Sequence, residues 1–287
     1  MNAAQILLIA KAPVPGRVKT RLCPPCTPAQ AARIAAAALA DTLETATGCT
    51  ATARTLVLDG DHPAPPGWAT LPQRGGLLGD RLANAFADAR PAGTAVLLIG
   101  MDTPQLTAST HLDPALSRLT GSDAVLGPAE DGGWWALGLR DPGHAEVLRR
   151  IATSTATTGW ETLTALRRRG LRVHLLPRLR DVDTAADART VAALCPPDSR
   201  FARAVATDVP AIRDAAVSEA PALPDAAATD GPALPDAAAT DGPAPLDPAA
   251  DDVPPPPDPP TRAEPAGGRT TAGTGLAAGT VSTVVGR

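Results

Sequence analysis

Short apolar runs and longer amphipathic segments follow one another along residues 1–198. An unbroken apolar run is typical of a strand that is buried on both faces, as in residues 5–10 and 94–100. The predicted strands cover residues 5–10, 53–59, 94–100, 123–127, 133–139 and 171–177. The predicted helices cover residues 27–46, 78–89, 107–119, 158–170 and 183–194, and the last of these is expected to be the final helix.

Residues that cap helices support two of the predicted helix starts. Thr27 and Gln30 have the spacing of a capping box, in which each side chain bonds the backbone N–H of the other residue. Thr158 and Glu161 repeat this spacing, and Gly170 is typical of a helix end. The hydrophobic pattern and the capping signals therefore agree on where these helices begin.

The alternation of strands and helices determines the expected fold class. Strands that are separated by helices pair in a mostly parallel sheet, with helices on both faces. We therefore expect a three-layer α/β/α domain of Rossmann-like type in residues 1–198. Such sheets bind ligands at the carboxyl ends of their strands, so the residues that directly follow a strand are the candidates for chemistry.

The composition changes near residue 199. Residues 199–287 hold 15 of the 32 prolines, a tandem repeat of ALPDAAATDGP at 222–232 and 233–243, and one aromatic residue, Phe201. Such a segment cannot bury enough apolar surface to offset the loss of chain entropy, so we expect it to be a disordered tail. Two roles are open for it, a solvated tail outside catalysis or a docking segment for a protein partner.

Charge and cysteine content narrow the class of protein. The 287 residues carry a formal net charge of −4, but the acidic excess lies in residues 199–287, and residues 1–198 have a net charge of +2. Because the chain has no broad basic face and few aromatic residues, we expect no nucleic-acid partner. No apolar run reaches the roughly 18 residues of a membrane span. The lack of signal-peptide features and the four cysteines, interpreted as free thiols, predict a cytoplasmic protein.

The first predicted strand leads directly into a basic loop, AKAPVPGRVKTRL. Gly16 permits a turn at which a side chain would clash, and the prolines limit the entropy of the loop. The loop holds both lysines of the chain among four cations, Lys11, Arg17, Lys19 and Arg21. Clustered cations suit a polyphosphate, although the spacing matches neither a Walker A loop nor a GxGxxG loop. An anion site is favoured over a solvated basic loop.

Asp102 lies at the carboxyl end of the third strand, in the segment IGMDTPQL. A carboxylate at this edge faces the ligand crevice and can hold Mg²⁺ or Mn²⁺, hard cations that keep waters and bridge to phosphates. The alternative is an ordinary cap for the helix that follows. The basic loop ends at the same edge of the sheet, which favours the metal.

The segment GPAEDGGWWALGL places Asp131 between two predicted strands. The DGG sequence suits an ordinary acidic turn, whereas Gly132 and Gly133 would also allow a ligand to approach the backbone closely. The two interpretations are equally supported. Trp134 and Trp135 point to opposite faces of a strand, so we expect one in the core and one at the pocket.

Asp181 and Asp183 precede the last predicted helix, in the segment LRDVDT. Asp183 or Thr184 is expected to be the N-cap of that helix. The alternative is that this segment supplies a second metal ligand.

Cys23 and Cys26 form a CxxC pair in the segment CPPC. A zinc site needs a second pair of ligands, and Cys49 and Cys195 are isolated in the sequence. A redox role would place the pair at a helix N-terminus, which Cys26 approaches. Incidental loop thiols are the favoured interpretation.

Five segments in this order, AKAPVPGRVKTRL, LLGDRL, IGMDTPQL, GPAEDGGWWALGL and LRDVDTAADA, resemble an uncharacterised bacterial family of transferases with the glycosyltransferase A fold, the radical-SAM/selenodomain-associated type. The resemblance spans about residues 4–196. This fold is shared with nucleotide-diphospho-sugar transferases and with molybdenum-cofactor guanylyltransferase-like proteins. The CPPC segment and the Trp134–Trp135 pair depart from the family pattern.

The resemblance implies a role for each segment. The loop from Lys11 to Arg21, including Gly16, would wrap the phosphates of a nucleotide. Asp102 would bind the metal, Asp183 would complete its site, and Asp131 would lie toward the acceptor. The residues implied to border the base and ribose are Gln73, Gly76 and Gly79, with Arg81 nearby.

We therefore predict a metal-dependent transferase that uses a nucleotide-diphosphate sugar, a small-molecule acceptor and Mg²⁺ or Mn²⁺. Arg17 and Lys19 would offset charge on the leaving diphosphate, and Asp131 is the third predicted catalytic residue. The alternative enzyme is a nucleotidyltransferase that acts on a phosphorylated acceptor and releases pyrophosphate. The chain has no lysine after Lys19 that could reach an α-phosphate, which favours sugar transfer. The alternative outside enzymes is a non-catalytic nucleotide-binding protein.

Overall fold

A seven-stranded sheet forms the centre of the computed structural model, which describes residues 4–89 and 93–210. The strands are β1 (Ala4–Lys11), β2 (Ala53–Asp59), β3 (Ala69–Pro72), β4 (Ala95–Gly100), β5 (Ala124–Pro128), β6 (Trp134–Leu139) and β7 (Val173–Leu175). They lie in the order β3-β2-β1-β4-β6-β5-β7, and all neighbours are parallel except the two pairs that involve β6. The predicted mostly parallel sheet is confirmed.

The direction of β6 follows from its short connection to β5. Residues 129–133 join the two strands, and a connection of this length can only form an antiparallel pair, since a parallel return needs a longer crossover. The first residue of β6, Trp134, therefore lies at the same edge of the sheet as the carboxyl ends of β1 and β4. This edge carries the candidate site.

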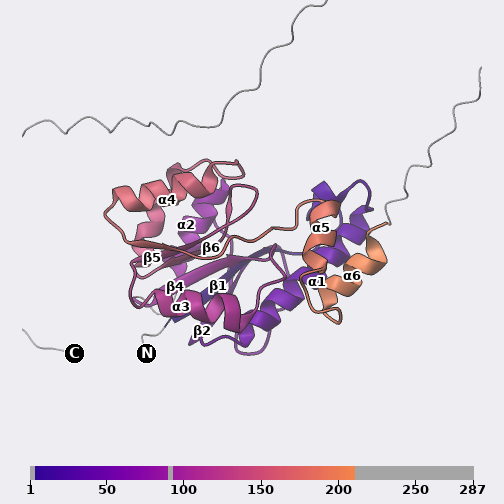
Figure 1. Cartoon of the computed structure of the whole chain (residues 1–287), viewed down its shortest axis with the longest axis horizontal. Helices are drawn as coiled ribbons and strands as arrows, with labels where there is room; N and C mark the ends of the chain where they lie inside the picture. Colours follow the sequence, from indigo (N-terminus) through magenta and orange to yellow (C-terminus); the bar gives the residue numbers. More distant parts are fainter. Residues whose placement is uncertain (1–3, 90–92, 211–287) are drawn as a thin grey trace, which may run out of the picture. The chain divides into compact units, whose positions relative to one another are not determined.

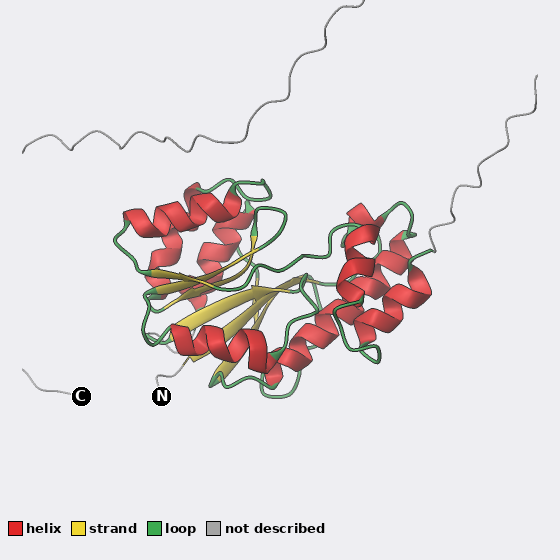
Figure 2. Ribbon diagram, in the orientation of Figure 1, coloured by secondary structure: helices red, strands yellow, loops and turns green. Residues whose placement is uncertain are grey.

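Helices cover both faces of the sheet (Figures 1 and 2). The helical segments are η1 (Thr20–Leu22), α1 (Pro28–Thr47), α2 (Leu78–Asp88), η2 (Ala108–Leu112), α3 (Asp113–Arg118), η3 (Pro142–Arg150), α4 (Thr158–Arg168), α5 (Ala185–Ala192) and α6 (Arg200–Asp208). Buried residues of α1 and α3 share one apolar cluster with the sheet, and those of α2, η3 and α4 share the cluster on the opposite face. The predicted three-layer arrangement is confirmed.

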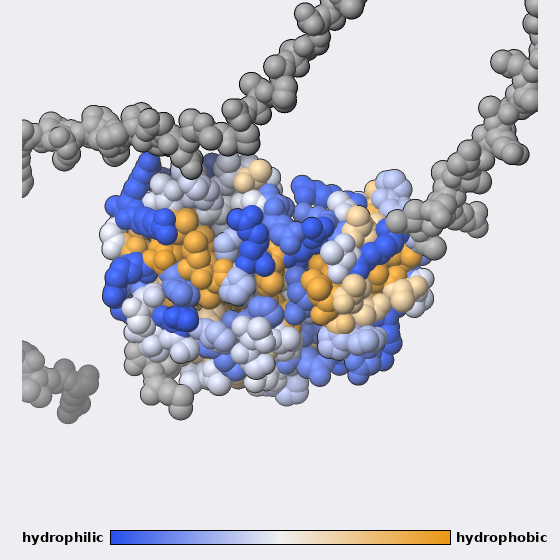
Figure 3. Space-filling model, in the orientation of Figure 1, coloured by the Kyte–Doolittle hydropathy of each residue, from blue (hydrophilic) through white to orange (hydrophobic). Residues whose placement is uncertain are grey.

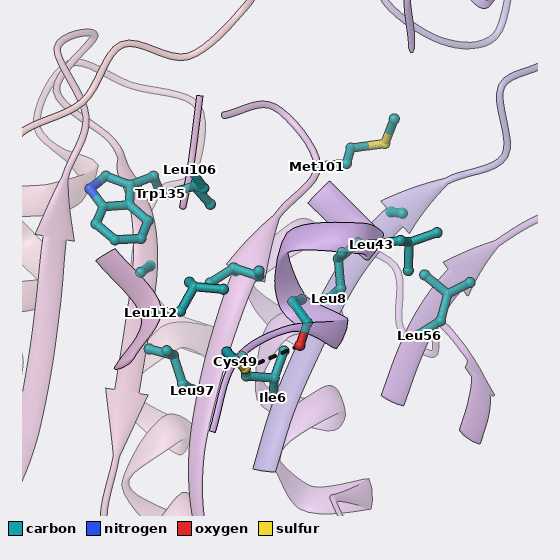
Figure 4. Close-up of a cluster of buried hydrophobic side chains, with 14 of the residues drawn as sticks. Ile6, Leu8, Leu43, Cys49, Leu56, Leu97, Met101, Leu106, Leu112 and Trp135 are labelled. Carbon is teal, nitrogen blue, oxygen red and sulfur yellow. Dashed lines mark hydrogen bonds between the residues drawn. The ribbon is translucent and has the colours of Figure 1, made fainter. Parts of the chain in front are cut away.

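The alternation of side chains along β1 explains why both faces are apolar. Ile6 and Leu8 belong to the cluster under α1 and α3, whereas Leu7 belongs to the cluster under α2. All three side chains are fully buried. Figure 4 shows Ile6 and Leu8 packed with Leu97 of β4 and Leu43 of α1. The continuous apolar run that predicted β1 thus reflects burial on both faces.

A third apolar cluster lies where α5 and α6 pack on α1, at the right of Figure 1. Phe201 of α6 is fully buried in it, beside Ile34 of α1. The helix α6 lies beyond residue 198, where the domain was expected to end, so folded residues continue to residue 210. The rest of the predicted tail, residues 211–287, lies outside the described residues.

The capping predictions have different outcomes at the two helices. The box between Thr27 and Gln30 is present at the start of α1 and is confirmed. The box predicted at Thr158 is wrong, because Thr158 is the first residue of α4 itself and the N–H of Glu161 donates to the carbonyl of Thr157 (2.8 Å). Thr157 is the residue at the N-cap position, and its hydroxyl donates to Glu161 (2.7 Å).

Two further elements differ from the expected pattern. The strand β3 was not predicted, since its four residues are largely exposed at the sheet edge and form no apolar run. The helix expected over 107–119 is divided into a π-helical turn, η2, and the short helix α3. On the face shown in Figure 3, hydrophobic residues are interspersed with polar ones. Among the described residues, no helix combines the length and apolar character that crossing a membrane requires.

Candidate functional site

A cavity of about 770 Å³ opens at the edge of the sheet where β1 and β4 end. Its walls include the loop after β1, the start of β6, and the segments 153–158 and 181–183. The predicted site residues that line it are Lys11, Arg17, Lys19, Arg21, Gln73, Gly76, Arg81, Asp102, Asp131 and Asp183. Two predicted residues, Gly16 and Gly79, are not among the lining residues. The fold thus brings together side chains that lie far apart in the sequence.

The basic loop turns sharply after β1. The N–H of Ala12 donates to the carbonyl of Asp59 (2.8 Å), and that of Arg17 donates to the carbonyl of Val14 (3.0 Å). Gly16 has φ +75°, in the left-handed region that favours glycine, but a Cβ atom there would have no neighbour within 4 Å. The expectation of a clash at Gly16 is therefore wrong. Backbone conformation, not crowding, accounts for the glycine.

Lys19 lies at the centre of the site, just before η1. Its ammonium nitrogen Nζ is 2.5 Å from Oδ1 of Asp102 and 3.8 Å from Oδ1 of Asp183, and it also donates to the carbonyl of Val182. The side chain is only 8% exposed. The backbone has φ 48° and ψ 42°, a left-handed conformation that is uncommon outside glycine. The predicted phosphate-binding lysine thus contacts both predicted metal ligands.

Asp102 follows β4 by two residues and lines the cavity. Its carbonyl accepts the N–H of Val182 (2.9 Å), which holds the segment 181–183 against the end of β4. The next helical segment, η2, is capped by Thr107, whose side chain accepts the N–H of Thr110. Asp102 is therefore not a helix cap, and its carboxylate is available to the cavity.

Asp183, like Asp102, does not cap a helix. Thr184 is the N-cap, and its side chain forms a capping box with Asp187. Asp183 instead directs its carboxylate toward the basic loop, where its Oδ2 lies 3.1 Å from Nη1 of Arg21. The choice between Asp183 and Thr184 is thus resolved in favour of Thr184 as the cap.

Asp181 is a cavity-lining carboxylate that was not among the predicted site residues. Its Oδ1 atom is buried and has no hydrogen-bond partner. Burial, followed by the charges of Asp102 and Asp131, raises the pKa of Asp181 to about 7. Its spacing from Asp183 in the DVD segment was the sequence signal that could have identified it.

The donor atoms around the cavity suit a hard divalent cation. Asp102, Asp181 and Asp183 supply carboxylate oxygens, and the unpartnered Oδ1 of Asp181 is an acceptor that a cation would satisfy. Within residues 4–89 and 93–210, however, no three carboxylate, histidine or cysteine side chains are arranged as a complete metal site. The residues therefore fit a cation that obtains part of its ligands from substrate phosphates and water, as Mg²⁺ commonly does.

Asp131 occupies the turn between β5 and β6. Its Oδ1 accepts the N–H of Gly133 (2.8 Å), which is the local bond of an acidic turn, and the side chain also lines the cavity. Gly132 has φ +90°, and a Cβ there would lie 2.0 Å from the carbonyl oxygen of Ala156. The close approach at Gly132 is thus to the chain itself, and it fixes the turn that carries Asp131.

The two tryptophans have the environments that the strand pattern predicts. Trp135 is 2% exposed, and its indole N–H donates to the carbonyl of Pro177 (3.0 Å). Trp134 lines the cavity beside Asp131 and Gly133. One tryptophan is therefore in the core and one at the pocket, as expected.

Gln73 and Arg81 form the side of the cavity next to β3 and α2. The amide of Gln73 donates to the carbonyl of Ala10 (2.7 Å), and Arg81 pairs with Asp59 (3.0 Å). Gly79 does not line the cavity, and packing explains the glycine at this position. A Cβ atom there would lie 2.4 Å from the carbonyl oxygen of Leu148. The glycine permits α2 to pack closely on η3.

The cysteine pair lies away from the cavity lining. Cys26 is buried in the cluster that contains α5 and α6, and burial raises the pKa of its thiol. Cys23 is half-buried at the edge of the same cluster. Both thiols therefore pack against the helical cluster, outside the cavity lining.

The chain is similar to one protein family and to several solved structures. Residues 31–155 match the family model described as "Uncharacterized protein conserved in bacteria (DUF2064)". No curated protein matches the chain. A crystal structure described as a putative nucleotide-diphospho-sugar transferase from Desulfovibrio desulfuricans G20 shares 28% identity, covers 72% of this chain and 98% of its own, and has a TM-score of 0.64.

Two more distant structures also align with the chain. Rv0371c from Mycobacterium tuberculosis H37Rv has 21% identity, a TM-score of 0.46, and coverage of 67% of this chain and 97% of its own. A cytidylyltransferase from Leptospira borgpetersenii has 13% identity, a TM-score of 0.46, and coverage of 67% and 85%. Both are too distant to inform the chemistry of this site.

These findings confirm the predicted fold and the predicted resemblance, and they support the prediction of a nucleotide-utilising transferase. The chain therefore resembles the DUF2064 family over residues 31–155, and over most of its described length it has the fold of the Desulfovibrio nucleotide-diphospho-sugar transferase-like protein.

Proposed function

We propose that this chain is a metal-dependent transferase that uses a nucleotide-diphosphate sugar. The observation that supports this most directly is the meeting of loop cations and carboxylates in one cavity at the edge of the sheet. A diphosphate needs cations within reach, which Arg17 and Lys19 provide. A divalent metal needs hard oxygen ligands, which Asp102 and Asp183 provide.

The nucleotide would lie with its base and ribose along Gln73 and Gly76. The Gln73 side chain is fixed by its bond to the carbonyl of Ala10, and Arg81 is held by Asp59. A wall whose side chains are already held in place can orient a nucleoside without a large entropic cost. The diphosphate would then extend toward the basic loop.

The leaving diphosphate is where charge develops during transfer. Arg17 and Lys19 would stabilise this charge from the loop, and a divalent cation bound by Asp102 and Asp183 would supply Lewis-acid stabilisation. Pre-positioned charges of this kind usually supply the largest part of the rate enhancement. The chain's own contribution is to hold these groups at one edge of a rigid sheet.

The acceptor would bind beside Asp131 and Trp134. The bond from Gly133 fixes the Asp131 carboxylate at Oδ1, so Oδ2 would be the atom that accepts the proton of an acceptor hydroxyl. The packing of Gly132 against Ala156 holds this turn in place. Asp131 thus has the position and the fixed orientation that a general base needs.

The proposal can be tested by product analysis. The full chain is incubated with Mn²⁺ and either nucleotide sugars or nucleoside triphosphates, and chromatography separates nucleoside diphosphate from pyrophosphate. Sugar transfer or donor hydrolysis releases the nucleoside diphosphate, and Asp102→Asn should abolish this release. Asp198→Asn is the matched control, since Asp198 is exposed and does not line the cavity.

Two outcomes would contradict this proposal. Release of pyrophosphate alone, from triphosphates and a phosphorylated acceptor, would indicate the nucleotidyltransferase. Tight binding of nucleotides without turnover of any donor would indicate the non-catalytic binding protein.

A further inference from the structure

Both carboxylates assigned to the metal already contact cations of the chain. Nζ of Lys19 lies 2.5 Å from Oδ1 of Asp102 and 3.8 Å from Oδ1 of Asp183. Nη1 of Arg21 lies 3.1 Å from Oδ2 of Asp183. Lys19 is one of the two cations assigned to the leaving diphosphate, and Arg21 belongs to the same loop, which would wrap the phosphates. The groups that would hold the metal and those that would hold the phosphates are therefore paired with one another.

The position of Lys19 is held by several independent contacts. Its ammonium also donates to the carbonyl of Val182, and its side chain is 8% exposed. A lysine that is this deeply buried needs partners for its charge, and here it has two carboxylates and a carbonyl. The contact differs from a surface ion pair, such as that of Arg74 with Asp88, in which the arginine side chain is 54% exposed.

An ammonium group and a divalent cation exclude each other at these distances. Both carry positive charge, and like charges a few ångströms apart in a partly buried site repel each other strongly. A metal that binds Asp102 and Asp183 must therefore displace the ammonium of Lys19. That displacement leaves Lys19 buried without a partner unless another anion receives it.

We propose that Lys19 is a positioning residue that couples metal binding to nucleotide binding. Its ammonium occupies Asp102 and Asp183 in the free protein and transfers to the phosphates when the nucleotide binds, which releases the carboxylates to the metal. This inference depends on the proposed function, because it takes the metal ligands and the phosphate cations from it. By linkage, nucleotide and metal then raise each other's affinity.

The exchange keeps the charges of Lys19, Arg21, Asp102 and Asp183 paired in both states. In the free protein, Lys19 and Arg21 neutralise Asp102 and Asp183. In the complex, the phosphates take the two cations and the divalent metal takes the two carboxylates. The site can thus remain folded without ligand, and it avoids holding a metal when no nucleotide is present.

The test is the affinity of the full chain for Mn²⁺ without any nucleotide, measured by the electron paramagnetic resonance signal of free Mn²⁺. Lys19→Met removes the competing charge and should bind Mn²⁺ about tenfold more tightly than the wild type, within the usual range of coupling between sites. The matched control is Lys11→Met. Lys11 is the other lysine of the same loop and lines the same cavity, so this variant should leave Mn²⁺ affinity close to that of the wild type.

Two further variants keep the proposal testable if Lys19→Met does not fold. Lys19→Gln removes the charge but retains a hydrogen-bond donor, and it should also bind Mn²⁺ more tightly. Arg21→Met removes the exposed second cation from Asp183 and should give a smaller gain in affinity. Mn²⁺ affinity that is unchanged or weaker in the Lys19 variants, or a gain of the same size in Lys11→Met, would overturn the proposal.

The variant Asp102→Asn distinguishes a failure of this inference from a failure of the proposed function. Loss of Mn²⁺ binding in Asp102→Asn, together with no gain in the Lys19 variants, would overturn the coupling and leave the metal site standing. Equal Mn²⁺ binding by Lys19→Met with and without the added Asp102→Asn substitution would overturn both.

Discussion

Two sets of ion pairs join the first part of the chain to residues much later in the sequence, and their surroundings differ. In the helical cluster, Arg33 of α1 binds both oxygens of Asp208 in α6 (2.9 and 2.5 Å). In the cavity, the ammonium of Lys19 lies between Asp102 and Asp183. Arg33 and Asp208 lie over an apolar core that contains Phe201, whereas Lys19 lines a cavity.

This difference separates a structural ion pair from an exchangeable one. The fork of an arginine fits a carboxylate in one geometry, and one guanidinium bonds both oxygens of the buried Asp208 carboxylate. A lysine is a point charge on a flexible stem, and Lys19 is shared between two carboxylates that also line the cavity. The helical pair is therefore suited to stability and the cavity pair to ligand exchange. The following predictions test that division.

The largest expected effect is on stability, at Phe201. Phe201→Ala removes a fully buried aromatic ring between α1 and α6 and should lower the free energy of unfolding by about 3–5 kcal/mol. Urea denaturation measures this loss. Leu194→Ala is the control, because Leu194 is 65% exposed and should change stability little. An unaffected Phe201→Ala would mean that α6 contributes nothing to the folded domain.

The next effect is on turnover, at Asp102. Asp102→Asn should reduce the release of nucleoside diphosphate by roughly 10²- to 10³-fold, the usual loss when one charge-stabilising group is removed. Its free energy of unfolding should fall by less than that of Phe201→Ala, since the Asp102 side chain is 44% exposed and Lys19 keeps Asp183 and the carbonyl of Val182 as partners. Urea denaturation beside the turnover assay checks both. A parallel loss of stability and turnover would erase the contrast between the two regions.

The sequence allowed the edge of the site to be predicted because strand ends are local features. Asp102 was recognised from the apolar run of β4 that precedes it, and the loop cations from their position after β1. The assignment of Trp135 to the core followed from the alternation of a strand. Each of these inferences needs only neighbouring residues.

The remaining features depend on contacts between distant segments. The pairing of Lys19 with Asp183 joins residues that are 164 positions apart, and nothing in either segment alone indicates it. The need for glycine at position 79 also comes from a distant segment, because a side chain there would meet the backbone of Leu148. The helix α6 was missed because its short apolar face lies among proline-rich sequence. The capping box predicted at Thr158 is absent because α4 begins one residue earlier than the spacing indicated, with Thr157 at the N-cap.

A smaller effect is expected on the pH dependence of stability, at Asp181. Because the pKa of Asp181 is raised to about 7, the folded chain keeps a proton there that the unfolded chain loses near its ordinary value of 3.8. The wild type should therefore lose stability as the pH rises from about 4 to 7. Asp181→Asn is neutral at every pH and should be more stable at pH 8, by about 2 kcal/mol because water partly shields the site.

Thermal unfolding of both proteins in EDTA at pH 4.5 and pH 8 measures this difference. The advantage of Asp181→Asn should be clearly smaller at the lower pH, because Asp181 is still protonated in the folded wild type and the pH lies less than one unit above the unfolded pKa of 3.8. An equal advantage at the two pH values would show that packing, rather than charge, distinguishes the variant.

The smallest effect is expected at Arg33, and it completes the comparison. Arg33→Met removes the cation from Asp208 but keeps an apolar stem over the helical cluster, so the loss of stability should be clearly smaller than that of Phe201→Ala. Turnover and Mn²⁺ affinity should not change, because Arg33 does not line the cavity. The same charge removal at Lys19 should instead alter Mn²⁺ affinity. If Arg33→Met changed Mn²⁺ affinity as strongly as Lys19→Met does, the effect at Lys19 would reflect the overall charge of the domain and not its contact with Asp102.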